Sequence, residues 1–401
     1  MIGISKLYMG QTEASDPLRY GRQSAALPSH LLQFSSDKKP IVVWNITQRC
    51  NLKCRHCYAS GVADISQELT HDEALRAIDG FADFGCPVLL FSGGEPFMRE
   101  DVLDLAEYAR HKNLRVVFST NGTRITKAIA GRIAKIGVSY VGISIDGVRE
   151  THDRFRGVPG AYDRSLEAIR LCREAGIKVG LRVTLTRANA QELPAIFQLM
   201  RDEQIPRICF YHLVYTGRGA EIKTEDLSHE ESRQAVDRII DETKASFNMG
   251  HPLEVLTVDN HCDAPYLWMR MAREGATNAN EVLKLLLMNG GNSSGHGLSC
   301  VSWDGTVYPD QFWRNKPLGN VRNQSFGEIW GNPQPDSLLE QLRNKPKYVT
   351  GRCKSCRFLA LCGGNFRARA EAATGELWGE DPACYLTNAE IEGPALPLIR
   401  T

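Results

Sequence analysis

Three cysteines lie within one nine-residue stretch of the chain, Cys50-Asn-Leu-Lys-Cys54-Arg-His-Cys57-Tyr58. Three residues separate the first pair and two separate the second, so this loop offers three thiolates and no fourth. Structural zinc sites and electron-transfer clusters normally take four protein ligands. Three thiolates would leave one iron of a [4Fe–4S] cluster open to a small molecule, whereas a zinc knuckle would need a distant fourth ligand.

The composition of the 401-residue chain limits the classes of partner. Lys and Arg number 48 against 47 Asp and Glu, so no net charge favours nucleic acid or a membrane surface. No apolar run is long enough to span a bilayer, and the first ten residues lack the apolar core of a signal peptide. The twelve cysteines therefore indicate reduced thiols and cluster ligands in a cytoplasmic protein, not a disulfide framework.

Six apolar runs alternate with amphipathic segments between residues 39 and 213. They cover residues 39–47, 87–92, 114–120, 139–145, 178–186 and 207–213. Continuously apolar strands that alternate with helices predict a parallel sheet with helices outside it. Six such units predict an α/β fold in the form of a partial (β/α)6 barrel. Functional residues of such sheets lie at the carboxyl ends of the strands.

Glycine-rich and polar motifs follow these strands. In chain order they are 92–96 (Ser-Gly-Gly-Glu-Pro), 119–122 (Ser-Thr-Asn-Gly), 144–147 (Ser-Ile-Asp-Gly) and Arg182 on the fifth strand. Glycines let backbone groups approach a ligand closely, and the carboxylate of Glu95 is an acceptor suited to an ammonium group. Asn-Gly and Asp-Gly are also common turn dipeptides, so ordinary turn chemistry is the alternative for the second and third motifs.

The three-cysteine loop, the tyrosine after it and the Gly-Gly-Glu turn resemble the signature of the radical S-adenosylmethionine (SAM) enzymes. The resemblance implies a [4Fe–4S] cluster on Cys50, Cys54 and Cys57, whose open iron takes the amino and carboxylate groups of SAM. It also implies a set of residues that contact SAM: Tyr58, Gly93, Gly94, Glu95, Thr120, Asn121, Ser144, Asp146 and Arg182. For Arg182, a carboxylate of the substrate or an acidic residue of the barrel is the alternative partner.

A second cysteine group lies near the end of the chain and comprises Cys353, Cys356, Cys362 and Cys384. Four thiolates close a tetrahedral set, and zinc is the generic competitor of an iron–sulfur cluster there. Downstream of such a barrel, the group resembles the auxiliary-cluster domain called SPASM, or its shortened twitch form. Asp310 and Phe366 stand where the full SPASM pattern has cysteines. We therefore expect one auxiliary [4Fe–4S] cluster, which leaves Cys300 without an evident partner set.

These features predict four segments. They are an N-terminal extension at 1–37, the radical SAM partial barrel at 38–245, a linker with helices and a glycine-rich loop at 246–297, and a small cysteine-rich auxiliary domain at 298–401.

Several longer stretches resemble the tetrapyrrole-modifying group of radical SAM enzymes. They are 141–147, 168–182, 215–219, 310–313, 318–322 and 377–384, and 1–22 resembles the haem-pathway branch. The resemblance implies an iron tetrapyrrole substrate, 12,18-didecarboxysiroheme, and a reduced flavodoxin or ferredoxin-type electron donor. The haem-pathway branch removes two acetates to give iron-coproporphyrin III, and the haem d1 branch removes two propionates.

Four residues are candidates for contacts with this substrate: His261, Cys262, Arg218 and Arg314. His261 and Cys262 lie between the two cysteine groups and offer ligands for a substrate iron, with a surface or capping role as the alternative for His261. Arg218 and Arg314 suit propionates because a guanidinium matches a carboxylate in bidentate fashion. Most arginines are merely solvated, which is the alternative for both.

Two further functions stay open at this point. A peptide-modifying enzyme would need an N-terminal peptide-binding domain, and the 37 residues before Lys38 are too few for one. An iron–sulfur carrier or redox sensor is the non-enzymatic alternative. The open three-cysteine site and the Gly-Gly-Glu turn argue against it.

Overall fold

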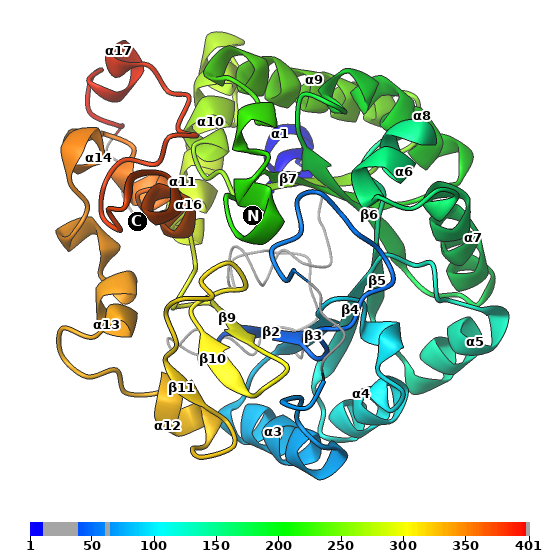
Figure 1. The fold of residues 1–401 in the computed structure, drawn as a ribbon. Helices are drawn as coiled ribbons and strands as arrows, with labels where there is room; N and C mark the ends of the chain where they lie inside the picture. Colours follow the sequence, from blue (N-terminus) through cyan, green and yellow to red (C-terminus); the bar gives the residue numbers. More distant parts are fainter. Residues whose placement is uncertain (11–38, 61–64, 398–401) are drawn as a thin grey trace.

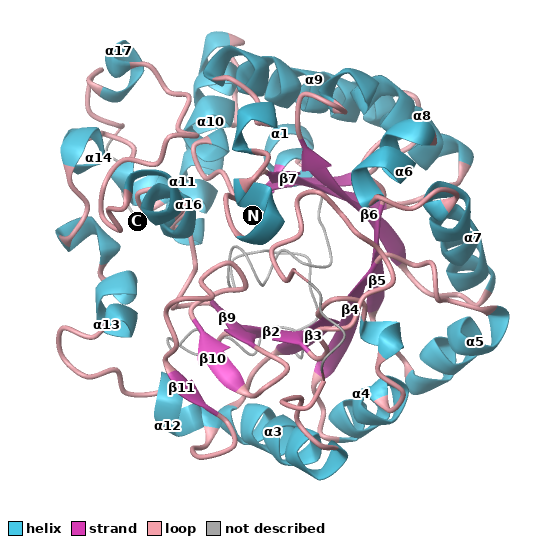
Figure 2. Ribbon diagram, viewed as in Figure 1, coloured by secondary structure: helices cyan, strands magenta, loops and turns pink. Residues whose placement is uncertain are grey.

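The computed structural model describes residues 1–10, 39–60 and 65–397. One sheet of eleven strands runs through the described chain in the order β1-β8-β7-β6-β5-β4-β3-β2-β9-β10-β11. The strands form a curved inner wall, and helices lie outside it (Figures 1 and 2). The expected partial α/β barrel is confirmed. Most of the predicted N-terminal extension, from residue 11 on, lies outside the described residues.

The six predicted strands are all present and pair in parallel. They are β2 (Ile41–Asn45), β3 (Val88–Ser92), β4 (Arg115–Thr120), β5 (Tyr140–Ser144), β6 (Val179–Leu185) and β7 (Arg207–His212). The outer helices are α3 (His71–Phe84), α4 (Val102–His111), α5 (Lys127–Ile136), α6 (Glu150–Arg156), α7 (Ala161–Glu174), α8 (Leu193–Asp202) and α9 (His229–Asn248).

Aromatic side chains fill the layer between the first strands and their helices. Trp44 stacks on Phe91 with ring centroids 5.8 Å apart, and Phe91 stacks on Phe118 at 5.4 Å. Phe81 of α3 meets Trp44 edge-on at 5.6 Å. All four side chains are fully buried. Because burying one such side chain stabilises the fold by about 1.5–3 kcal/mol, this layer fixes β2, β3 and β4 relative to α3.

Further strands extend the sheet at both edges. β8 (Glu254–Val258) pairs in parallel with β7, and β1 (Ile2–Gly3) closes that edge antiparallel to β8. On the other side, β9 (Leu298–Val301) pairs in parallel with β2, and β10 (Thr306–Tyr308) and β11 (Gly319–Asn320) follow as an antiparallel ribbon. The sheet thus runs through the predicted boundaries at 245 and 297, so the four-segment division stays a prediction.

The remaining helices are α1 (Ile4–Met9), α10 (Asp263–Arg273), α11 (Ala279–Asn289), α12 (Phe326–Trp330), α13 (Leu338–Arg343), α14 (Gly351–Ser355), α15 (Leu359–Cys362), α16 (Arg367–Thr374) and α17 (Asn388–Ile391). Most of them lie on the left in Figure 1, whereas α1 packs on α9 and α12 packs on α3. α15 packs on α10 and α11, which places the second cysteine group next to the barrel. Within the described ranges, none of the helices has the length and apolar character to cross a membrane.

A glycine pair tests how tightly α6 packs against the cysteine loop. Gly157 has a φ of +70°, and an added Cβ would lie 2.8 Å from the carbonyl oxygen of Lys53. Gly176 has a φ of +75° with nothing within 4 Å of an added Cβ. Gly176→Ala should cost only the left-handed conformation, about 1–2 kcal/mol. Gly157→Ala should lower the anaerobic unfolding midpoint further and reduce the iron content; equal midpoints would contradict this packing.

Candidate active site

An open cavity with about 1100 Å³ of space lies at the carboxyl ends of the barrel strands. It collects residues from the cysteine loop and from the ends of β3 to β7. Eleven residues singled out from the sequence line it: Cys50, Cys54, Cys57, Tyr58, Gly93, Gly94, Thr120, Asn121, Ser144, Arg182 and Arg218. The cysteine loop and the strand-end motifs, which lie far apart in the chain, therefore meet at one place.

The three cysteines of the loop line this cavity, and the sulfurs of Cys50 and Cys54 each receive a hydrogen bond. The Leu52 N–H donates to Cys50 Sγ at 3.4 Å, and Arg156 Nη1 donates to Cys54 Sγ at 3.5 Å. Burial, with a smaller contribution from the neighbouring thiols of Cys54 and Cys57, raises the pKa of Cys50 to about 12. As thiolates, these sulfurs would repel one another, and a cationic iron cluster would offset that repulsion. Thiols whose sulfurs also accept hydrogen bonds therefore fit an iron–sulfur cluster.

No group of three or more His, Cys, Asp or Glu side chains in the described residues is arranged to hold a single metal ion. The donors on the sulfurs are therefore the observation on which the fit to a cluster rests.

Arg218 holds the cysteine loop in place. Its backbone N–H donates to the Cys57 carbonyl oxygen at 3.0 Å, and its Nε donates to the Cys54 carbonyl oxygen at 2.8 Å. Arg218 lines the cavity as well. In the structure, Arg218 positions the cysteine loop. Its contact with a substrate propionate stays a prediction.

The two glycines of the Gly-Gly-Glu turn lie directly against the cysteine loop. A Cβ on Gly93, whose φ is +137°, would lie 2.5 Å from the Thr47 carbonyl oxygen. A Cβ on Gly94 would lie 2.2 Å from the carbonyl oxygen of Arg49. The Gly94 N–H donates to Thr47 O at 2.8 Å, and the Glu95 N–H donates to Arg49 O at 2.8 Å. The missing Cβ atoms thus allow the turn to dock on the loop that carries the cysteines.

Glu95 lies beneath the cavity wall, not in it. Its carboxylate accepts from Thr120 Oγ1 at 2.6 Å, from the Asn121 N–H at 2.8 Å and from the Phe97 N–H at 3.3 Å. Burial raises the pKa of Glu95 to about 7. These bonds tie the turn after β3 to the end of β4 and hold Thr120 and Asn121 at the cavity. The contact of Glu95 with SAM stays a prediction.

Asp146 is fully buried and forms an ion pair with Arg156. The Thr184 N–H donates to Asp146 Oδ1 at 2.6 Å. Burial raises the pKa of this carboxyl, but the Arg156 guanidinium overcomes that effect and the net pKa lies below the usual value. Asp146 does not line the cavity, so its contact with SAM stays a prediction. In the structure, this ion pair holds the Arg156 guanidinium beside Cys54.

Arg182 is a buried cation of the cavity wall. Its guanidinium lies 4.6 Å from the centre of the Tyr211 ring, and no carboxylate pairs with it in the described part of the chain. A desolvated guanidinium without an acid partner suits a ligand carboxylate.

Three of the four substrate candidates lie away from the cavity, with different partners. The His261 N–H donates to Asn365 Oδ1 at 2.6 Å, and the His261 ring is buried. The Cys262 thiol donates to Asn260 Oδ1 at 3.0 Å and hydrogen-bonds the Cys384 thiol. The Arg314 guanidinium lies over the Trp303 and Tyr308 rings, at 4.2 and 5.3 Å from their centres. Their substrate contacts stay predictions.

Sequence reasoning missed several residues of the cavity wall: Arg156, His212, Gln311 and Phe312. Asp259, two residues before the predicted ligand His261, lines the cavity as well. His212 ends β7, so its position at a strand end was an available signal. Asp259 follows β8, a strand that was not predicted, and it has a φ of +67°. Burial raises the pKa of Asp259 to about 7. Arg156 lies in a charged helix whose pattern gives no such signal.

The second cysteine group also assembles. Cys353 and Cys362 lie in α14 and α15, and burial raises their pKa values to about 11 and about 12. Both thiols interact electrostatically with the thiols of Cys356 and Cys384. A hydrogen bond from Cys262 lowers the pKa of Cys384. The four thiols thus lie near enough to influence one another, and their number suits an auxiliary cluster with four protein ligands.

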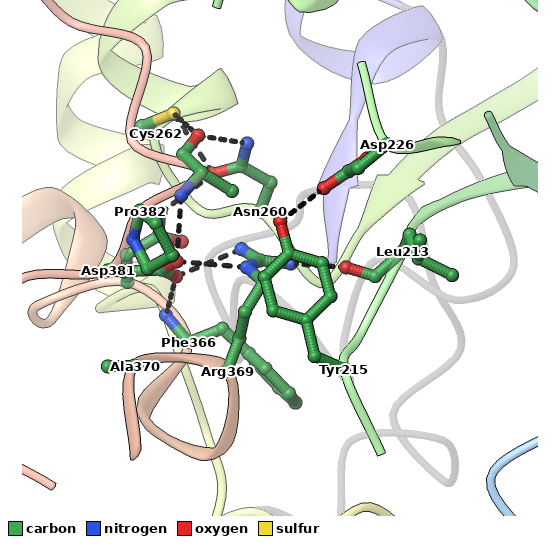
Figure 3. Close-up of polar contacts among 12 residues, drawn as sticks. Leu213, Tyr215, Asp226, Asn260, Cys262, Phe366, Arg369, Ala370, Asp381 and Pro382 are labelled. Carbon is green, nitrogen blue, oxygen red and sulfur yellow. Dashed lines mark hydrogen bonds and ion pairs between the residues drawn. The ribbon is translucent and has the colours of Figure 1, made fainter. Parts of the chain in front are cut away.

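A buried ion pair joins this second group to the cavity wall (Figure 3). Arg369 Nε and Nη2 donate to the two carboxylate oxygens of Asp381, both at 2.9 Å, and both side chains are fully buried. Arg369 Nη1 donates to the carbonyl oxygen of Leu213, a cavity residue, at 3.1 Å. The Cys384 N–H donates to Asp381 O at 3.0 Å. One bidentate pair thus sets the position of Cys384 relative to the end of β7.

The sequence matches the Radical SAM superfamily over residues 44–200 and the SPASM iron–sulfur cluster-binding domain over residues 295–357. It is 56% identical over 395 residues to Fe-coproporphyrin III synthase of Methanosarcina barkeri, covering 98% of this chain and 99% of that one. It is 44% identical to pre-heme d1 synthase of Dinoroseobacter shibae, over 88% and 87% of the two chains. It is 34% identical to an AdoMet-dependent heme synthase of Methanosarcina barkeri, over 86% and 95%.

Solved structures share the fold. SuiB of Streptococcus suis, bound to its precursor peptide SuiA, gives a TM-score of 0.69 at 18% identity, over 87% of this chain and 76% of that one. The enzyme anSMEcpe with bound AdoMet and a peptide gives 0.65 at 19% identity, over 86% and 94%.

The Arg156 contact generates a test of the loop's electrostatics. A guanidinium next to a ligand sulfur favours the reduced, more negative state of a cluster. Arg156→Gln should therefore shift the midpoint potential of the three-cysteine cluster to a more negative value in an EPR-monitored titration. Arg132→Gln, which removes an exposed arginine of α5, is the matched control and should leave the potential unchanged. An unshifted potential in Arg156→Gln would show that the guanidinium does not act on Cys54.

Proposed function

The chain belongs to the radical SAM superfamily, and we propose that it removes two acetate side chains from 12,18-didecarboxysiroheme to give iron-coproporphyrin III. The observation that carries this proposal is the likeness to Fe-coproporphyrin III synthase, which extends over almost the whole of both chains at 56% identity. The product would feed a siroheme-dependent route to haem.

The chain is a radical SAM enzyme whose cofactors are SAM, a SAM-binding [4Fe–4S] cluster and an auxiliary iron–sulfur cluster. In this proposal Cys50, Cys54 and Cys57 hold the first cluster. The second is a [4Fe–4S] cluster, and its ligands are Cys353, Cys356, Cys362 and Cys384. When bound, SAM and the reduced first cluster supply a 5′-deoxyadenosyl radical that abstracts hydrogen from an unactivated carbon.

The chain's own residues bind and orient the reactants. Gly93 and Gly94 bring the turn after β3 against the cysteine loop, and Thr120, Asn121 and Ser144 line the adjacent strand ends. The guanidinium of Arg182, which has no carboxylate partner among the described residues, takes a carboxylate of SAM or of the tetrapyrrole. Because these groups lie on rigid strand ends, they hold the reacting atoms in one arrangement.

The haem d1 branch is the second candidate, favoured by the 44% identity to pre-heme d1 synthase. It would use the same cavity and remove propionates. A peptide-modifying activity has weaker support, because the likeness to SuiB and anSMEcpe, at 18% and 19% identity, concerns the fold alone.

The proposal includes a reduced flavodoxin or ferredoxin-type protein as the electron donor and a cytoplasmic setting. In support of that setting, all twelve cysteines lack disulfide partners, as is typical of proteins in reducing compartments.

Anaerobic turnover followed by mass spectrometry of the tetrapyrrole tests the proposed function. The reconstituted protein receives SAM, a low-potential reductant and 12,18-didecarboxysiroheme. Loss of two acetate groups is the expected result. Loss of propionates would place the chain in the haem d1 branch. An unchanged macrocycle with SAM still cleaved would discard the tetrapyrrole substrate.

Single cysteine substitutions test the assignment of the two clusters. Cys54→Ala should abolish SAM cleavage and leave the auxiliary cluster in place. Cys353→Ala should lose roughly half of the iron, because one of two four-iron clusters is removed, and should keep SAM cleavage. Cys86→Ala changes a buried core thiol and serves as the control for iron content. If Cys353→Ala keeps its full iron and sulfide, the auxiliary ligand assignment is wrong.

A further inference from the structure

His212 occupies the carboxyl end of β7 and lines the cavity. Its Nε2 lies 3.0 Å from Asp263 Oδ2, and both side chains are buried. The other carboxylate oxygen of Asp263 accepts from the Tyr385 hydroxyl at 2.6 Å. An ionised carboxylate only accepts hydrogen bonds, so Nε2 is the nitrogen that carries a proton toward Asp263, and in the neutral tautomer Nδ1 has the lone pair.

This arrangement is the one found around histidines that bind metals. Such a histidine usually donates its second ring N–H to a carboxylate, which fixes the tautomer and the ring orientation and makes the ligating nitrogen more basic. In the described part of the chain, no hydrogen bond occupies Nδ1 of His212. The carboxylate is in turn anchored by Tyr385, the residue after Cys384 of the second cysteine group.

The other histidines of this region lack that arrangement. His56 also lines the cavity, but its ring stacks on Phe155 with centroids 4.7 Å apart, and its Nδ1 is buried without a partner. His261, the ligand expected from the sequence, does not line the cavity, and its Nδ1 is likewise buried without a partner. Among the described residues, only His212 combines a place in the cavity wall with a carboxylate on one ring nitrogen.

We propose that His212 binds the central iron of the tetrapyrrole substrate through Nδ1, with Asp263 and Tyr385 as positioning residues. The inference rests on the proposed function, because it takes an iron tetrapyrrole as the ligand. A bond from β7 to the iron fixes the centre of the macrocycle and leaves its rim as the part that faces the cysteine loop across the cavity. The side chains to be removed sit on that rim.

Binding of iron-coproporphyrin III and of metal-free coproporphyrin III to the full-length protein with both clusters oxidised tests this inference. The wild-type protein should bind the iron complex more tightly than the metal-free ring and give the absorption and EPR spectra of imidazole-bound ferric iron. His212→Gln keeps an N–H donor for Asp263, which protects the fold, but should lose those spectra and the preference for iron. Asp263→Asn should weaken binding of the iron complex by about 10- to 100-fold.

Controls separate an iron ligand from a structural role. Affinity for the metal-free ring should be the same in His212→Gln and wild type, and iron and sulfide content should match. His261→Gln should keep the wild-type spectra. Unchanged spectra in His212→Gln, or loss of the spectra in His261→Gln alone, would overturn the inference. The proposed function would still stand in that case, provided that the wild-type protein binds the iron complex more tightly than the metal-free ring. Binding of neither probe by the wild type would contradict both.

Discussion

The docking of the Gly-Gly-Glu turn on the cysteine loop determines where the chemistry can occur. The loop has no regular secondary structure of its own, and backbone hydrogen bonds from Gly94 and Glu95 fix it to the end of β3. The contact is so close that neither glycine has room for a Cβ. Glu95 continues the chain of bonds to β4, and Arg156 and Arg218 hold the loop from the other side. The rigid sheet thereby sets the position of the three thiols.

Buried charges connect this site to the second cysteine group. Burying an ion pair costs desolvation free energy, so the Arg369–Asp381 pair is weak evidence for stability. The position of the ion pair gives a better reason for its presence than stability does. The pair fixes the loop that carries Cys384 against Leu213 at the cavity. The bonds from His212 through Asp263 to Tyr385 make a second connection between the same two regions. Both connections hold the region of the second cysteine group against the cavity, and Gln311 and Phe312 line its wall.

The sequence was sufficient for the six inner strands and for the motifs at their ends, because buried parallel strands are continuously apolar. It was insufficient for β8, which lay in the predicted linker, so the place of Asp259 at a strand end in the cavity was not predicted. Glu95 and Asp146 turned out to be bonded beneath the cavity wall, since residue type and spacing do not reveal the direction of a side chain. His212 and Arg156 act through partners 51 and 102 residues away, Asp263 and Cys54, which no local pattern can identify.

The central claim is that the three-cysteine loop presents an open iron to SAM within this cavity. Electron–nuclear double resonance on the reduced Cys353→Ala variant, with SAM labelled by ¹⁵N in the amino group and ¹⁷O in the carboxylate, tests it most directly. The account predicts hyperfine coupling of both labels to the remaining cluster. If SAM binds and neither label couples to that cluster, the iron has no open position and the account is wrong.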